Sequence, residues 1–355
     1  MTASTPSVTQ GAHLVGSVNL ADAESVMTTV AGHLGDRLRR IPDGEVGERY
    51  YWIQFQRDRL AATDGISRVG EKGNLLRGQF DARLLRLDDD VDAGALRLPS
   101  LGYADAAVDS YAVFRRLCDR GTIAPGTRFQ VSLPTPAAVI ASFVVPDDRS
   151  ALEPVYERAL FAELERILAV IPHSDLAIQW DTAAEFGLLE SDRLPAGFPL
   201  TPWFDDVLDG VVQRAARQAS AVPGDVEVGY HLCYGDVEEA HFVQPADTGV
   251  LTAFASGLLE RSERPITWLH LPVPIERDDE AYFAPLAALE LPEQTELYLG
   301  LIHHEDGVDG ALRRIRAAHT AQSRFGVATE CGFGRGPAER TAPLLDLHAA
   351  VSDAW

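Results

Sequence analysis

Short apolar segments alternate with amphipathic helical segments along nearly the whole chain. The helical spacing of apolar residues is clear over residues 21–34, 151–171 and 307–325. The apolar segments predict eight strands, at residues 12–18, 38–44, 127–134, 175–181, 225–233, 265–271, 296–304 and 325–332. A strand followed by a helix, repeated eight times, is typical of an α/β protein of the (β/α)8 TIM barrel type.

One long interval interrupts this alternation after the second predicted strand. Residues 50–125 contain the helix-like YYWIQFQRDRL and the strand-like ALRLPSLGY, so we expect an insertion made of a helix plus a hairpin. The polar start of the chain, residues 1–10, predicts a disordered tail, which leaves residues 11–355 as a single domain.

A doubly wound open sheet is the main competing fold. It requires a glycine-rich turn after the first strand, and the segment GSVNLAD at that place has one glycine. The segment GFGRGP, residues 332–337, resembles part of a dinucleotide-binding fingerprint but follows the last strand. The pattern therefore favours the barrel.

The charge and the ends of the chain restrict the partners. The formal net charge is −22, which argues against nucleic acids and anionic membranes as partners. No apolar run is long enough for a transmembrane helix, and the first residues do not resemble a signal peptide. Three widely spaced cysteines are typical of a reducing compartment, so we expect a cytoplasmic protein.

Polar residues with chemical potential follow the predicted strands. In a barrel, the carboxyl ends of the strands carry the catalytic groups. His231 and Cys233 lie two residues apart, so they point to the same face of a strand, and Cys331 ends the last strand. Imidazole and thiolate are the preferred ligands of zinc. A small buried cysteine is also a common core residue, and spacing alone leaves both interpretations open.

Five segments in order resemble one family. HLVGSV, PDGEVGER, IQWDTAAE, YHLCYG and ATECGFGR are similar to the strand-end motifs of the catalytic C-terminal domain of cobalamin-independent methionine synthase, within the uroporphyrinogen decarboxylase-like barrel superfamily. The resemblance extends over nearly the whole chain and implies the same barrel.

The resemblance implies a zinc site and an amino-acid site. It places zinc on His231, Cys233 and Cys331. The family's glutamate ligand has no match in TWLHLPVP, so His270 is the candidate for the fourth ligand and Glu276 the alternative. The positions that match the family's substrate and catalytic residues, with an arginine for an anionic group, are Ser17, Glu45, Asp181, His303, His304, Glu305 and Arg335.

The implied activity is zinc-dependent transfer of a methyl or other alkyl group to a thiol. The partners would be a small thiol and an alkyl donor, and a homo-oligomer is left open. The family motif I-D-E-P-A is replaced by WDTAA, and no basic cluster is present for a folate polyglutamate tail, so we expect another donor. The alternative is a metal-free lyase or decarboxylase like uroporphyrinogen decarboxylase, with Arg37, Arg39, Arg40 and Arg49 as candidates for binding substrate carboxylates.

Overall fold

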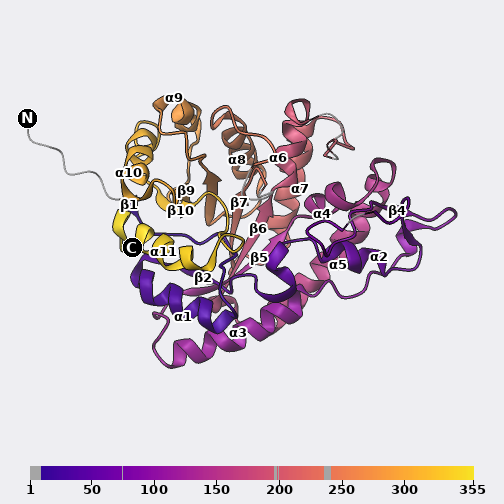
Figure 1. Cartoon of the computed structure of the whole chain (residues 1–355), viewed down its shortest axis with the longest axis horizontal. Coiled ribbons are helices and arrows are strands. Elements are labelled where there is room, and N and C mark those ends of the chain that lie inside the picture. Colours follow the sequence, from indigo (N-terminus) through magenta and orange to yellow (C-terminus); the bar gives the residue numbers. More distant parts are fainter. Residues whose placement is uncertain (1–8, 74, 196–197, 199, 236–240) are drawn as a thin grey trace, which may run out of the picture.

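A curled sheet of seven parallel strands forms the centre of the molecule (Figure 1). The computed structural model describes residues 9–73, 75–195, 198, 200–235 and 241–355. The sheet order is β10-β9-β8-β7-β6-β5-β2, so neighbouring strands follow one another along the chain. The strands are β2 (Arg40–Pro42), β5 (Arg128–Pro134), β6 (Leu176–Thr182), β7 (Glu227–Leu232), β8 (Trp268–Pro272), β9 (Glu296–Ile302) and β10 (Gly326–Thr329).

Seven of the eight predicted strands correspond to the seven strands of this sheet. The first predicted strand, residues 12–18, is not a regular strand. It nevertheless lies between the two edges of the sheet. Ala12 forms parallel bridges with Leu38, just before β2, and with Val327 of β10. Ser17 bridges Gly44, just after β2. The architecture is therefore compatible with a TIM-barrel-like fold.

Helices surround the sheet, and each contacts its neighbours around the molecule (Figure 1). Buried apolar residues line their inner faces, which is why amphipathic sequence forms them. Caps fix their first turns, as where Asp22 accepts from the backbone N–H of Ser25. The helices are α1 (Ala23–Leu34), α3 (Tyr103–Asp119), α4 (Pro136–Phe143), α5 (Arg149–Val170), α6 (Ala184–Leu189), α7 (Val207–Ser220), α8 (Gly249–Arg261), α9 (Glu280–Phe283), α10 (Gly307–Ala318) and α11 (Thr341–Val351).

The segment between β2 and α3 contains a short helix, α2 (Gln56–Ala61), and an antiparallel pair, β3 (Ile66–Arg68) with β4 (Leu85–Leu87). The strand-like sequence at residues 95–103 is not a strand. The backbone N–H of Leu101 in this stretch donates to Glu163 at 3.1 Å, and so does that of Ala104, in the first turn of α3, at 2.7 Å.

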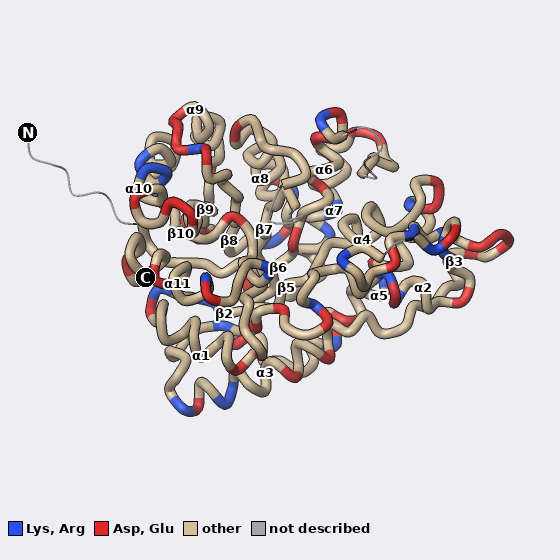
Figure 2. Tube along the Cα trace, in the orientation of Figure 1, with Lys and Arg blue, Asp and Glu red and all other residues tan. Residues whose placement is uncertain are grey.

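The two ends of the described chain meet. Strand β1 (Thr9–Gln10) pairs in parallel with β11 (Ser352–Asp353), so the last two residues of the predicted tail are part of a small sheet. Residues 1–8 of that tail lie outside the described residues. No helix among the described residues combines the length and apolarity needed to cross a membrane. Acidic and basic residues are interspersed over the outer helices and loops (Figure 2).

Candidate metal centre

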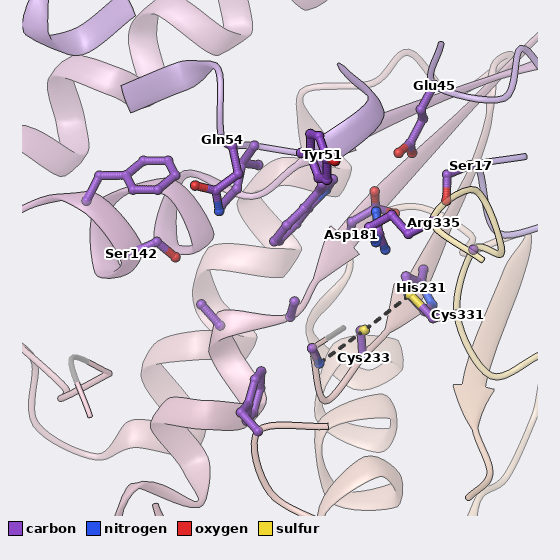
Figure 3. A pocket seen from close by; sticks show the side chains of 18 of the residues that line it. Ser17, Glu45, Tyr51, Gln54, Ser142, Asp181, His231, Cys233, Cys331 and Arg335 are labelled. Carbon is purple, nitrogen blue, oxygen red and sulfur yellow. Dashed lines mark hydrogen bonds between the residues drawn. The ribbon is translucent and has the colours of Figure 1, made fainter. Parts of the chain in front are cut away.

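His231, Cys233 and Cys331 meet at the carboxyl ends of β7 and β10 (Figure 3). The Sγ atoms of Cys233 and Cys331 are 3.8 Å apart, and Nε2 of His231 lies 3.7 Å from Sγ of Cys331. Two thiolates bound to one tetrahedral zinc at the usual bond length are about 3.8 Å apart. The donor set and its spacing therefore fit zinc.

Hydrogen bonds hold His231 and Cys233 in place at the end of β7. The side chain of Thr182 donates to the carbonyl of His231 at 2.9 Å, and the backbone N–H of Cys233 donates to the carbonyl of Thr182 at 3.1 Å. The backbone N–H of Gly235 lies 3.3 Å from Sγ of Cys233. A donor at this distance stabilises a thiolate, which is the form that binds metal.

His270 determines which nitrogen of His231 is available. Nε2 of His270 lies 2.9 Å from the carbonyl oxygen of Thr329, so this nitrogen carries the hydrogen. Burial lowers the pKa of His270 to about 4, so the ring is neutral and its Nδ1 accepts. Nδ1 of His231, 2.7 Å away, must therefore donate to it. The lone pair of His231 is left on Nε2, which faces the two thiols.

His270 was predicted to be the fourth metal ligand, but this arrangement places it behind His231 instead. Both of its ring nitrogens are used, one by His231 and one by Thr329, and it stands behind His231 as an outer partner. The other candidate, Glu276, is an exposed residue beyond the end of β8. Among the described residues, the group that can hold a metal consists of His231, Cys233 and Cys331.

Replacing His270 with alanine should weaken zinc binding about 10- to 100-fold, because outer partners of metal-bound histidines typically contribute that much. The ring of His231 would lose the acceptor that fixes its tautomer. Competition with a chelator of known affinity measures the change. His303→Ala is a matched control, since His303 is also largely buried and bonds to the Val273 carbonyl. An unchanged affinity in His270→Ala would contradict the assigned role.

The metal-ligand cluster lines a cavity of about 290 Å³ that also contains two carboxylates, Glu45 and Asp181. Burial raises the pKa of Glu45 to about 7. Burial, and next the charge of Glu45, raise the pKa of Asp181 well above its ordinary value. The side chain of Gln179 donates to Asp181 at 2.9 Å. Both carboxyl groups therefore keep a proton to a higher pH than they would in water.

A left-handed turn brings Glu45 into the cavity. Gly44 and Glu45 have φ values of 82° and 52°, a conformation that is costly for glutamate. Asp43 stabilises the turn, because it accepts from the backbone N–H of Glu45 at 3.0 Å and binds Arg49 at 2.7 Å. Gly16 leaves the space that Glu45 needs, since a Cβ there would lie 2.5 Å from its Oε1.

The glycine-rich loop after β10 packs on Ser17 and carries Arg335 into the cavity. A Cβ at Gly332 or Gly334 would lie 2.2 or 2.6 Å from Ser17 atoms, so only glycine fits at both positions. The backbone N–H of Gly334 donates to the Ser17 hydroxyl at 3.2 Å. The positive charge of Arg335 lowers the pKa of both Glu45 and Asp181. The loop thus brings a cation beside the carboxylate pair.

The residues predicted to supply the catalytic acid after β9 do not line this cavity. Nε2 of His303 donates to the carbonyl of Val273 at 2.9 Å, and burial lowers its pKa to about 4. His304 and Glu305 are exposed. In the described part of the chain, the acids that do line the cavity are Glu45 and Asp181.

The arginines that a decarboxylase-like reaction would require are engaged elsewhere. Arg40 binds Glu227 at 2.6 Å and Glu296 at 2.7 Å, deep inside the sheet. Arg39 also binds Glu296, at 2.7 Å. The remaining two, Arg37 and Arg49, bind the carbonyl of Ser352 and the carboxylate of Asp43. Within the residues that the structure describes, none of these four arginines lines the cavity.

Two cavity residues, Trp52 and Arg57, were not among the predicted site residues. Both come from the segment between β2 and α3. Trp52 has a φ of 52°, and its side chain lowers the pKa of Asp181, so a strained backbone position supports a site carboxylate. The sequence contains no spacing signal that relates this segment to the strand ends.

Fold and site together define a TIM-barrel-like α/β protein with a histidine–cysteine–cysteine cluster at its strand ends. No family model and no curated protein matches the chain. Among solved structures, a B12-independent methionine synthase from Shewanella sp. W3-18-1 in complex with selenomethionine is similar, with a TM-score of 0.59 and 15% identity over 97% of this chain and 96% of that one. A Listeria monocytogenes protein described as a vitamin-B12-independent methionine synthase has a TM-score of 0.57 and 15% identity over 97% of both chains. Likeness at this identity establishes the shared fold, and both neighbours are of the family that the sequence resembles.

Proposed function

We propose that the protein transfers a methyl or other alkyl group to the thiol of a small amino-acid-like substrate, with zinc bound by His231, Cys233 and Cys331. The observation that carries this proposal is the meeting of three zinc-type ligands with a carboxylate pair and an arginine in one cavity. Zinc, when bound, supplies a thiolate at neutral pH by lowering the pKa of a coordinated thiol.

The other cavity residues suit the rest of such a substrate. Glu45 and Asp181 would bind its ammonium group, and their raised pKa values would let one of them keep a proton while doing so. Arg335 would bind its carboxylate. In the absence of another cavity acid in the described residues, the same carboxylate pair is our candidate for protonating the leaving group. The selenomethionine bound to the Shewanella protein is a molecule of this amino-acid class.

Cobalt substitution tests thiol binding without knowledge of the donor. With Co²⁺ in place of zinc, adding homocysteine should intensify the sulfur-to-cobalt charge-transfer absorption, because a third sulfur joins those of Cys233 and Cys331. Homoserine, which has a hydroxyl in place of the thiol, is the matched control and should leave the band unchanged. A cobalt-loaded protein whose spectrum ignores homocysteine at saturating concentration would exclude the proposed acceptor chemistry.

A further inference from the structure

Arg57 is a buried cation at the part of the cavity formed by α2 and α4. Arg57 is 6% exposed and lines the cavity together with Ser142 and Phe143 of α4. Its guanidinium lies 4.5 Å from the ring centre of Phe143, and Nη1 donates to the carbonyl of Asp81 at 3.0 Å. In the described part of the chain, its Nε has no hydrogen-bond partner and no carboxylate lies within ion-pair distance.

The two carboxylates whose charges act on Arg57, those of Asp58 and Asp81, are bound by other arginines. Asp58 pairs with Arg68 at 2.5 Å, and Asp81 pairs with Arg83 at 2.6 Å. Three guanidiniums therefore share two carboxylates at this place, in a protein whose net charge is −22. A buried positive charge without a paired anion is costly, so a local surplus of this kind points to a negatively charged ligand.

The wall of this part of the cavity is apolar. It is formed by aromatic and aliphatic side chains from five stretches of chain: Trp52, Ile53, Phe143, Ala184, Leu200 and Phe242. Gln54 and Ser142 lie on the other side of Tyr51 from the metal-ligand cluster (Figure 3). The side-chain oxygen of Gln54 is buried and has no partner among the described residues. The apolar wall suits the hydrocarbon or aromatic body of a ligand.

We propose that this part of the cavity binds a carboxylate carried on an apolar hydrocarbon or aromatic body, and that this molecule is the second substrate, which brings the alkyl group. The carboxylate would bind Arg57, and the apolar body would lie along Trp52 and Phe143. Only the assignment as second substrate rests on the proposed function, because binding of the amphipathic anion depends on neither zinc nor turnover.

Octanoate and octanamide are suitable probes, since they differ only in charge and in the head group. Calorimetric titration of the metal-free full chain should show octanoate binding roughly tenfold more tightly than octanamide, as expected for one charge-assisted contact. In Arg57→Gln the octanoate affinity should fall by about the same factor while the octanamide affinity stays unchanged. Arg59→Gln is the matched control, because Arg59 follows on the same helix, is more exposed and pairs with Glu48.

Equal affinity of the wild-type protein for the two probes, or binding of neither, would overturn the proposal. A preference for octanoate that survives Arg57→Gln would also overturn it, since the anion would then bind elsewhere, as at Arg335. If Arg57→Gln does not fold, the wild-type comparison and Arg57→Lys, which should keep the preference, still decide the question. Zinc content and the cobalt spectrum are measured separately, so failure of the metal site leaves this result interpretable.

Discussion

Replacing Cys331 with serine should abolish stoichiometric zinc binding. The change removes one of three ligands and leaves only His231 and Cys233, at the end of β7. The loss in affinity should exceed the about 10- to 100-fold that outer-partner changes cause, because a direct thiolate bond is removed. Elemental analysis after zinc reconstitution and dialysis measures the outcome, and the cobalt charge-transfer band should weaken in parallel.

Cys118→Ser is the control for this experiment. Cys118 lies on α3, far along the chain from both metal-site cysteines, and burial raises the pKa of its thiol. The variant should retain one zinc per chain. Zinc retained at full occupancy by Cys331→Ser, or a reconstituted wild-type protein without zinc, would refute the metal centre and with it the proposed activity. A transfer reaction observed in zinc-free wild-type protein would do the same.

The core of this site could be predicted because it depends on strand periodicity. Residues two apart along an extended chain point to the same face, and this places His231 of β7 and Cys233, just after β7, together. The end of the last strand brings Cys331 to the same edge of the sheet. The same logic places Ser17, near the end of the first predicted strand, beside the cavity. Positions fixed by the pleat and by strand order are therefore readable from the sequence.

His270 shows where that logic fails. It lies on β8 directly opposite His231 in register, so its ring meets the back of the His231 ring and not the thiols. Sequence spacing gives the strand and the residue, but not the depth of a side chain relative to its neighbour. His303 does not take its predicted catalytic place for a similar reason, since its ring turns to the carbonyl of Val273, just after β8.

Trp52 and Arg57 could not be predicted for a different reason. They belong to the segment after β2, which follows no strand–helix repeat. Their place in the cavity depends on tertiary contacts such as the hydrogen bonds of Gln56 to the carbonyl of Leu101 and the hydroxyl of Tyr156. Such contacts join residues 45 and 100 positions apart, and no local pattern encodes them. The metal-ligand cluster is thus the predictable part of the site and the substrate end the less predictable part.

Replacing Glu45 with glutamine should make the protein more stable at pH 8 and leave its stability at pH 4.5 nearly unchanged. Burial raises the pKa of Glu45 from 4.5 to about 7, so between these values the folded state holds a proton that the unfolded state has lost. Wild-type stability therefore falls as the pH rises through this range, and the loss is complete above it. The shift corresponds to about 3 kcal/mol, or about 4 °C in Tm for a chain of this length.

Thermal melts of both proteins from pH 4.5 to 8 measure this difference, and the gap should open between pH 5 and 7. Glutamine also removes the negative charge that raises the pKa of Asp181, which adds to the gain. Glu48→Gln is the matched control, because Glu48 lies three residues further on, is exposed and pairs with Arg59. Its melts should follow those of the wild type. Parallel pH curves for Glu45→Gln and the wild type would mean that Glu45 is ionised at neutral pH without cost and that burial does not raise its pKa.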